Sequence, residues 1–477
     1  MLFSSIPFIV YFLPIVLLVY YVLSFSRPMQ NVWLLISSLL FYAYGEPMYV
    51  LLMIVSILVN SGAAIIIEKQ KNSTLKKTVL IIDLVFNIGL LFVFKYLGFV
   101  LGFFGESGQQ LAQDLNLVLP LGISFYTFQA LSYVVDVYRG VTKAENPFYV
   151  GLYISFFPQL IAGPIVQFNS IDDQLRNRKC TIDKLSFGLC RFTVGVAKKV
   201  LLANAFAGIA DKVFNWSLVG TEKLAVPASL AWLGSIAYSL QIYFDFSAYS
   251  DMAIGLGLCF GFKFKENFNY PYIATSISDF WKRWHISLTD WFREYVYIPL
   301  GGNRNENHDF VVRNMFVVWL LTGIWHGANW TFVFWGLFYF VFQLMERFTN
   351  FDTNVKSKFL KHLYTLFVVN MLWVLFRADG LYQAGRFYLN MFALNYNGVF
   401  SDTAWMLIKE NALQLALGIL FSMPVIPKLN AYFYSHQDSK AHIAYSIAYP
   451  VLMMAVLIVS ISYLVIGSYN PFIYFNF

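Results

Sequence analysis

The sequence predicts an all-α, polytopic membrane protein, and three observations support this prediction. The chain of 477 residues is 58% hydrophobic and only 12% charged, whereas a soluble domain carries about 25% charged residues. Its apolar residues form long runs, for example near 6–23, 48–66 and 78–104. These runs do not alternate at a period of two, so they are typical of membrane-spanning helices and not of strands.

The charge distribution indicates basic cytoplasmic loops rather than a nucleic-acid-binding surface. The formal net charge is +7, but Lys and Arg gather in short clusters between apolar runs. Such clusters mark cytoplasmic loops, so we place 68–77, 176–184 and 262–309 in the cytoplasm. The stretch 105–116 contains no Lys or Arg and is expected on the opposite side of the membrane, as is the N-terminus.

The start of the chain is expected to form a retained transmembrane helix. It lacks the basic beginning and the cleavage site of a signal peptide, and Pro7 and Pro14 interrupt its apolar run. The cysteines Cys180, Cys190 and Cys259 show no C-x-x-C spacing. We therefore expect neither a disulfide framework nor a bound metal.

Two apolar stretches contain helix-breaking residues. The stretch 119–135 begins with Pro120 and Gly122, and the stretch 156–166 contains Pro158 and Gly163. Such residues occur at membrane depth where the backbone is buried in protein or lines a cavity. We expect broken helices in both stretches, although an ordinary kinked helix is the alternative reading.

Two histidines stand out because each directly follows a tryptophan. His285 lies in 276–299, where apolar and aromatic residues recur at helical spacing opposite many charges. We interpret this stretch as an amphipathic helix lying at the cytoplasmic membrane surface. An interfacial histidine without a catalytic role is the alternative for His285.

The second histidine lies between two apolar runs, 315–325 and 330–345. Each run is shorter than the roughly 20 residues of a full crossing. We therefore expect a hairpin with its tip at 326–329 and with His326 inside the membrane protein. An ionisable residue there is a functional hypothesis, and a hydrogen-bonded packing histidine is the alternative.

A polar island interrupts the apolar run 225–260. Asp245 and Asp251 lie there within YFDFSAYSD. Buried carboxylates need partners, and we expect these to be the arginines of the segment that follows.

The motifs of several enzyme classes do not occur in the sequence. It contains no G-x-S-x-G, no G-x-G-x-x-G, no H-E-x-x-H and no Walker A motif. What remains is a pair of histidines in a membrane interior. A neutral histidine is suited to taking a proton from a hydroxyl while its oxygen attacks a carbonyl.

Four motifs together resemble the membrane-bound O-acyltransferase family, in its bacterial alginate O-acetyltransferase-like branch. They are FDFSAYSDMAIG, FNYPY, SISDFWKRWHISLTDWFREYVYIPLGGNR and LTGIWHGANWTFVFWG. The resemblance extends to LPLGISFYTFQALSYVVDVYRG, FFPQLIAGPIV, WVLFRA and the terminal NPFIYF, and so covers most of the chain.

The resemblance implies the fold and the cellular setting. It implies roughly 11 transmembrane helices, plus re-entrant and interfacial helices, around a central tunnel. Residues 1–477 would form a single integral membrane domain with its catalytic core at about 118–345. The expected location is the bacterial cytoplasmic (inner) membrane, in multiple passes.

The resemblance also implies the reaction. Family members move an acyl group from a thioester to a hydroxyl or amine, or to a partner protein. Bacterial members of this branch act with extracytoplasmic, esterase-like partners that acetylate a cell-surface polysaccharide. Alginate is our first expectation, and peptidoglycan or another exopolysaccharide is the alternative. We expect acetyl-CoA or another acyl thioester as the donor substrate, with no bound cofactor.

The site residues follow from this resemblance and from the residues themselves. The characteristic histidine of the family matches His326, the expected general base, and its second position, Asn or His, matches His285, expected to orient the thioester. We expect the remaining site residues to bind substrate: Asn329, which would polarise the acyl carbonyl, Trp325, Asp245, and the cations Lys282, Arg283 and Arg293, which suit phosphate groups.

Two other classes of protein fit parts of the pattern. A transporter would also have broken helices and polar groups at the membrane midplane, but usually with an internal repeat, which we do not find. A scaffold subunit of a polysaccharide export complex would need the histidines only for packing. Transfer of labelled acetyl groups distinguishes the enzyme from both.

Overall fold

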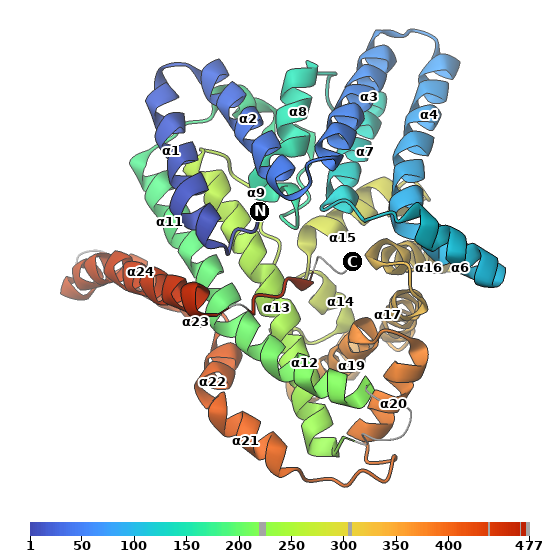
Figure 1. Cartoon of the computed structure of the whole chain (residues 1–477), viewed down its shortest axis with the longest axis vertical. Helices are drawn as coiled ribbons and strands as arrows, with labels where there is room; N and C mark the ends of the chain where they lie inside the picture. The colour runs from blue at the N-terminus through green and yellow to red at the C-terminus, as the bar shows by residue number, and fades with distance from the viewer. Residues whose placement is uncertain (219–225, 304–307, 437–438, 468, 474–477) are drawn as a thin grey trace. The chain divides into compact units, whose positions relative to one another are not determined.

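The computed structural model describes residues 1–218, 226–303, 308–436, 439–467 and 469–473 (Figure 1). Every regular element within these residues is helical. Residue contacts divide the chain into two units, which are described separately. Unit 1 comprises Met1–Phe192 and Tyr249–Glu266, and unit 2 comprises Thr193–Ala248 and Asn267–Phe477. The single domain expected from the sequence stays a prediction.

Unit 1 is built from the N-terminal helices. They are α1 (Leu13–Val22), α2 (Arg27–Gly45), α3 (Tyr49–Lys69), α4 (Ser73–Leu91), α5 (Leu97–Leu101), α6 (Gly105–Leu115), α7 (Ile123–Arg139), α8 (Pro147–Ser155), α9 (Phe157–Leu160) and α10 (Phe168–Asn177), with short π or 3₁₀ turns at Pro7–Phe12, Leu23–Phe25, Phe92–Tyr96 and Gly102–Phe104. Helices α3, α4 and α7 pack against one another (Figure 1). Helices α11 (Ile182–Ala197) and α13 (Ala228–Cys259) continue from one unit into the other.

The two stretches with helix breakers meet in unit 1. The second is broken as predicted, because α8 ends at Ser155 and only the short α9 follows before irregular backbone. In the first, the break lies only at the start, where Gly122 has φ 74°, and α7 is continuous after it. A Cβ on Gly122 would lie 2.7 Å from the carbonyl oxygen of Leu160. Glycine is therefore needed here for both the backbone conformation and the close approach.

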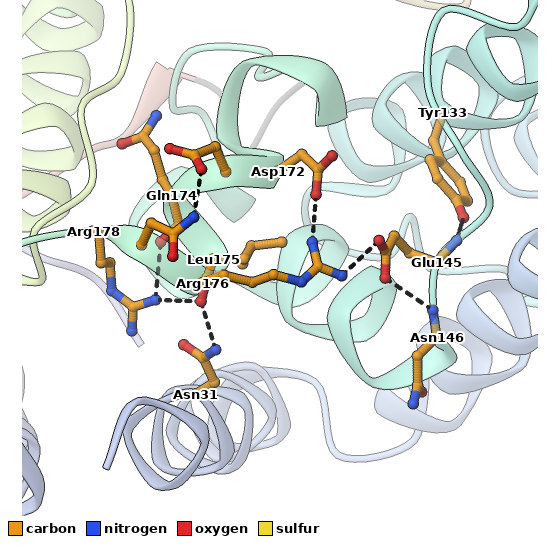
Figure 2. Close-up of polar contacts among 11 residues, drawn as sticks. Asn31, Tyr133, Glu145, Asn146, Asp172, Gln174, Leu175, Arg176 and Arg178 are labelled. Atoms are coloured by element: carbon orange, nitrogen blue, oxygen red, sulfur yellow. Dashed lines mark hydrogen bonds and ion pairs between the residues drawn. The ribbon is translucent and has the colours of Figure 1, made fainter. Parts of the chain in front are cut away.

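Polar contacts surround the C-terminal end of α10 (Figure 2). Arg176 forms ion pairs with Glu145 at 2.6 Å and with Asp172 at 2.8 Å. The Leu175 carbonyl, at the end of α10, accepts hydrogen bonds from Asn31 at 2.8 Å and from the buried Arg178 at 3.1 Å. These donors satisfy carbonyls that have no partner within the helix, and a cation at a helix C-terminus is electrostatically favourable.

Unit 2 holds the segment with both histidines. Its elements are the π turn Lys198–Ala203, α12 (Asn204–Leu218), the 3₁₀ turn Pro271–Ile273, α14 (Ile277–Trp281), α15 (Ile286–Phe292), the π turn Arg293–Tyr297, α16 (His308–His326), α17 (Trp330–Phe348), α18 (Phe351–Asn354), α19 (Lys358–Arg377), α20 (Leu381–Met391), α21 (Asp402–Glu410), α22 (Ala412–Phe421), α23 (Val425–Ser435) and α24 (Lys440–Ile466). Helices α16 and α17 pack side by side, and α19 packs against α17 (Figure 1).

The predicted hairpin is confirmed, with its turn between His326 and Trp330. Its helices are longer than expected. Each has 19 residues, about 28 Å at 1.5 Å per residue, close to the roughly 30 Å of a hydrocarbon core. As the short apolar runs predicted, neither helix is among the described stretches that are long and apolar enough to cross a membrane. Polar residues such as Asn314 and Glu346 account for the extra length of the helices.

The prediction of one amphipathic helix over 276–299 is wrong. Helix α14 ends at Trp281, and α15 begins only at Ile286. His285, between them, has a left-handed backbone with φ 45°, which no α-helix tolerates in its interior. The periodicity of the sequence did not reveal this interruption.

The described residues contain six helical stretches long and apolar enough to cross a membrane, or seven if the bent pair α21 and α22 is one span. The six are Pro7–Phe25, Tyr49–Lys69, Ser73–Leu115, Ile182–Trp216, Lys358–Arg377 and Lys440–Ile466. The chain is therefore a multi-pass membrane protein. Helix α7 is not among them, since it has 17 residues and carries the buried polar side chains of Thr127, Gln129 and Asp136.

Candidate functional site

His285 lies at the start of α15 with its side chain fully buried. Its ring packs edge-on against Phe246 of α13, with the ring centroids 4.7 Å apart. It also lies 6.1 Å from the ring of Trp325. The imidazole is therefore enclosed by aromatic rings and is not the partly wet interfacial side chain that was the alternative for His285.

Asn267 holds His285 in place. The Asn267 Oδ1 atom accepts hydrogen bonds from the backbone N–H of Ser287 at 3.2 Å and from the Ser287 hydroxyl at 2.8 Å. The Nδ1 atom of His285 lies 3.2 Å from the same oxygen. The Asn267 carbonyl accepts from the N–H of Ile286 at 3.0 Å. One asparagine thus bonds to the imidazole of His285 and to the two residues that follow it, Ile286 and Ser287.

His326 is the last residue of α16 and is 5% exposed. Three aromatic rings surround its imidazole: Trp325 and Trp335 at 4.9 Å and Phe376 at 5.1 Å between centroids. The rings of Trp335 and Phe376 come from α17 and α19. His326 is thus held where three helices of unit 2 meet.

Trp325 brings the two histidines into one site. Its buried indole contacts both imidazoles. The predicted catalytic residues His285 and His326, which are 41 positions apart in the chain, therefore pack against the same indole ring.

The protonation state of His285 follows from its surroundings. Burial lowers the pKa of His285 to about 3, because charging an imidazole away from water is unfavourable. His285 is therefore neutral at pH 7. A neutral imidazole can accept a proton, as the chemistry expected from the sequence requires.

Asn329 lies in the turn after His326 and begins α17. Its Oδ1 accepts from the N–H of Thr331 at 3.0 Å, and its Nδ2 donates to the carbonyl of Asp379 at 2.8 Å. Both ends of this carboxamide therefore make structural hydrogen bonds. They fix the backbone that follows His326, and an Asn at this position is a favourable helix cap.

The three predicted phosphate-binding cations lie on and around α14 and α15. Lys282 and Arg293 are exposed. Arg283 is half-buried and forms an ion pair with Asp279 at 2.9 Å. Its guanidinium also donates to the carbonyl of Asn269 at 3.3 Å. The sequence segment of His285 thus carries two exposed cations and one, Arg283, that pairs with Asp279 and bonds to the backbone.

Asp245 does not pair with an arginine of the following segment, so that expectation is wrong. It forms a buried ion pair with Lys199 at 2.7 Å and accepts a hydrogen bond from the N–H of Ile473 at 2.9 Å. Asp251, in unit 1, pairs with Arg191 at 2.9 Å. Both partner cations precede the aspartates in the chain, which the sequence alone did not indicate.

Two further residues position the site and were missed in the sequence. Glu346 of α17 accepts hydrogen bonds from the first N–H groups of α14, Ile277 at 2.5 Å and Ser278 at 3.1 Å. Trp281, at the end of α14, packs its ring against Trp335 and Tyr339 of α17. The hairpin that carries His326 therefore also holds the segment that leads to His285.

Comparison with known proteins agrees with these features. The family model for the membrane-bound O-acyltransferase family matches residues 145–383, a range that contains both histidines. The chain is 38% identical over 513 residues to a probable alginate O-acetylase AlgI of Pseudomonas putida, covering all of both chains.

Two other relatives share most of the chain. A probable alginate O-acetylase AlgI of Pseudomonas aeruginosa is 42% identical over 402 residues, which are 82% of this chain and 75% of that protein. A peptidoglycan O-acetyltransferase of Helicobacter pylori is 37% identical over 430 residues, which are 83% of this chain and 80% of that protein. The similarity thus extends well beyond the histidine motifs.

Proposed function

The chain belongs to the membrane-bound O-acyltransferase family and is an acyltransferase, and from this premise we propose that it takes part in O-acetylation of an extracytoplasmic cell-surface polysaccharide. The relatives named as alginate O-acetylases support alginate as the first candidate polymer. The relative named as a peptidoglycan O-acetyltransferase supports peptidoglycan as the alternative. The donor is acetyl-CoA or another acetyl thioester supplied from the cytoplasm.

One observation carries the assignment of the reaction to this site. The two imidazoles both pack against Trp325 in a buried aromatic environment. Such an environment excludes water, which would otherwise hydrolyse the thioester, and strengthens electrostatic interactions with the reacting atoms. General-base catalysis by a histidine contributes about 10²- to 10⁴-fold to a rate.

The residues have the following roles in this proposal. His326 is the general base that takes the proton of the acceptor hydroxyl while the oxygen attacks the thioester carbonyl. The proton then passes to the departing thiolate. His285 and Trp325 hold the reacting groups between them. Lys282, Arg283 and Arg293 attract the phosphates of the donor.

Two predicted residues support the site indirectly. Asn329 fixes the turn after His326 through its bonds to Thr331 and Asp379, so its contribution is to place the base. Asp245 lies next to Phe246, which packs on His285, and its pairing with Lys199 fixes that part of α13.

The proposal includes an architecture and a location. Roughly 11 transmembrane helices surround a tunnel through which the donor and acceptor reach the histidines from opposite sides. The protein lies in the bacterial inner membrane and works with an extracytoplasmic, esterase-like acetyltransferase that completes the modification.

The experiment is a transfer assay with the full chain in membrane vesicles. Vesicles receive acetyl-CoA labelled in the acetyl group, and labelled acceptor is measured for the parent, for His326→Ala and for His436→Ala. His436 is exposed, which makes it a matched control. We expect His326→Ala to lower transfer by at least about 100-fold and His436→Ala to leave it unchanged.

Other outcomes would contradict the proposal. Normal transfer by a folded His326→Ala protein would exclude His326 as the base and would favour a scaffold role. Movement of polysaccharide across the vesicle membrane without consumption of acetyl groups would identify a transporter.

A further inference from the structure

We propose that Asn267 is a positioning residue that holds His285 with its proton on Nδ1, so that Nε2 is the atom that accepts a hydrogen bond from the substrate. That this hydrogen bond to Nε2 contributes to acyl transfer rests on the proposed function. The tautomer itself follows from the geometry and is tested without measuring activity.

The first step concerns the orientation of the Asn267 carboxamide. A backbone N–H can only donate a hydrogen bond. The N–H of Ser287 points at the Asn267 side chain with a distance of 3.2 Å. The atom that receives it must therefore be the carboxamide oxygen and not the nitrogen. The Ser287 hydroxyl, at 2.8 Å, approaches the same oxygen.

The second step concerns the imidazole. The Nδ1 atom of His285 lies 3.2 Å from the oxygen of Asn267. An oxygen offers no proton, so Nδ1 must carry one. A neutral imidazole has a single N–H. Nε2 is therefore the nitrogen with the lone pair, and the partner at Nδ1 determines which nitrogen that is.

The third step is that the imidazole is neutral. His285 is 0% exposed and Asn267 is 0% exposed, and burial lowers the pKa of His285. Two charged groups lie next to residues of this site, and neither is both buried and unpaired. Asp245, beside Phe246 on α13, pairs with Lys199, whereas Lys282, on the segment of His285 itself, is exposed.

Two further titratable groups lie near His285. Arg283, two positions before His285, pairs with Asp279. On α16 the titratable group next to Trp325 is His326, whose ring packs against the indole. Burial is the cause that sets the protonation state of His285.

This tautomer changes the role expected for His285. An imidazole whose proton is bound to Asn267 cannot donate a hydrogen bond from Nε2 to the acyl carbonyl. It can accept one from an O–H or N–H group of the substrate. His285 therefore holds the substrate through a substrate proton, and protonation of Nε2 would abolish the interaction.

The first experiment reads the tautomer directly. The full chain is labelled with ¹⁵N-histidine and reconstituted in lipid, and the His285 signals are identified by their loss in His285→Asn. We expect ¹⁵N shifts of a neutral ring protonated at Nδ1, which is the less common form of free histidine. A ring protonated at Nε2 in the parent protein would overturn the proposal, whatever the protein's activity.

The second experiment measures turnover with a matched control. Asn269 is of the same residue type, two positions further on, and exposed. We expect Asn267→Leu to lower kcat by about 10- to 100-fold with little change in the KM of the donor, because the imidazole of His285 that holds the reacting group is misplaced whereas the cations expected to bind the donor are kept. Asn269→Leu should keep the parent kcat. Equal kcat for the two variants would contradict the proposal.

A third variant keeps the test valid if Asn267→Leu fails to fold. Asn267→Asp retains the acceptor oxygen but adds a negative charge, which stabilises the protonated imidazole and raises the pKa of His285. We expect Asn267→Asp to be active near pH 8 and to lose activity at least about threefold more than the parent between pH 7.5 and 5.5. An unchanged pH profile would show that Asn267 has only a structural role.

Discussion

Lys199 and Asp245 form an ion pair at 2.7 Å in which each side chain is only 2% exposed. Both charges also bind the last described part of the chain. Lys199 donates to the carbonyl of Pro471, and Asp245 accepts from the N–H of Ile473 at 2.9 Å. The pair therefore connects the π turn Lys198–Ala203, α13 and the C-terminal segment within unit 2.

Removal of one charge of this pair should be strongly destabilising. We expect Lys199→Met or Asp245→Asn to lower the free energy of unfolding by about 3–5 kcal/mol, because each leaves an uncompensated buried charge or unpaired polar groups. The double variant Lys199→Met/Asp245→Leu should recover part of this loss, because it removes both charges but leaves the Pro471 carbonyl and the Ile473 N–H without these partners. Thermal unfolding of the purified protein in detergent measures the effect.

The pair of Arg176 with Glu145 provides the control, because the Arg176 side chain is 41% exposed. Exposed pairs contribute about 0–1 kcal/mol, so Arg176→Ala should be nearly neutral. If Asp245→Asn were as stable as Arg176→Ala, the buried pair would not have the role assigned here.

The sequence predicted helices, the hairpin and the histidine pair because these depend on local patterns. Long apolar runs and the W-H dipeptides can be read directly from the sequence. The partner of Asp245 could not be predicted, because Lys199 lies 46 positions earlier and nothing in its local pattern distinguishes it from a loop lysine. Only tertiary packing brings the two together.

The N-terminal cap of α14 should matter for the site. Glu346 accepts from two N–H groups of α14, those of Ile277 and Ser278. We expect Glu346→Leu to lower the free energy of unfolding by about 2–6 kcal/mol, since it leaves two N–H groups unpaired and each costs about 1–3 kcal/mol. Glu410→Leu, at an exposed position, is the control in the same thermal unfolding assay and should change little.

Trp325 should affect turnover more than substrate affinity. Its indole packs against the imidazoles of both His285 and His326, so Trp325→Leu would remove the ring that both contact. We expect kcat for acetyl transfer to fall about 10- to 100-fold. Trp330→Leu is the control, because Trp330 is 48% exposed. Equal kcat for both variants would argue against a role of the Trp325 indole in positioning the two imidazoles.

The details that could not be read from the sequence are those that position the two rings. The left-handed backbone at His285 and its bond to Asn267 depend on a turn that helical periodicity conceals. Asn329 was expected to bind the acyl carbonyl because an amide near a catalytic histidine is a plausible donor. In the structure its amide bonds to Asp379, a contact across 50 residues that has no local signature.

The hairpin should not tolerate a side chain at Gly336. A Cβ there would lie 2.4 Å from the backbone oxygen of Trp319 and 3.2 Å from Gly323 of the facing helix. We expect Gly336→Ala to lower the free energy of unfolding by about 1–3 kcal/mol, because backbone cannot move aside without separating the helices. Gly385→Ala, with open space around it, should be neutral or slightly stabilising. A neutral Gly336→Ala in the same unfolding assay would show that the helices are not in close contact.

The stability of the protein should fall on acidification because of His285. Its pKa is about 3 in the folded protein against 6.5 for an ordinary histidine. Below pH 6.5 the unfolded chain therefore binds a proton that the folded chain does not. The contribution of a neutral His285 is fully present above pH 6.5 and is lost progressively as the pH falls towards 3. At pH 5 the loss is about 2 kcal/mol, at about 1.4 kcal/mol per pH unit.

The variant His285→Asn isolates this effect, because asparagine tolerates a left-handed backbone and does not titrate. Unfolding midpoints of the parent and His285→Asn are compared between pH 7.5 and 5. We expect the parent to lose more stability than the variant over this range. Parallel pH profiles would mean that the buried imidazole is already protonated, or is reached by water, in the folded protein.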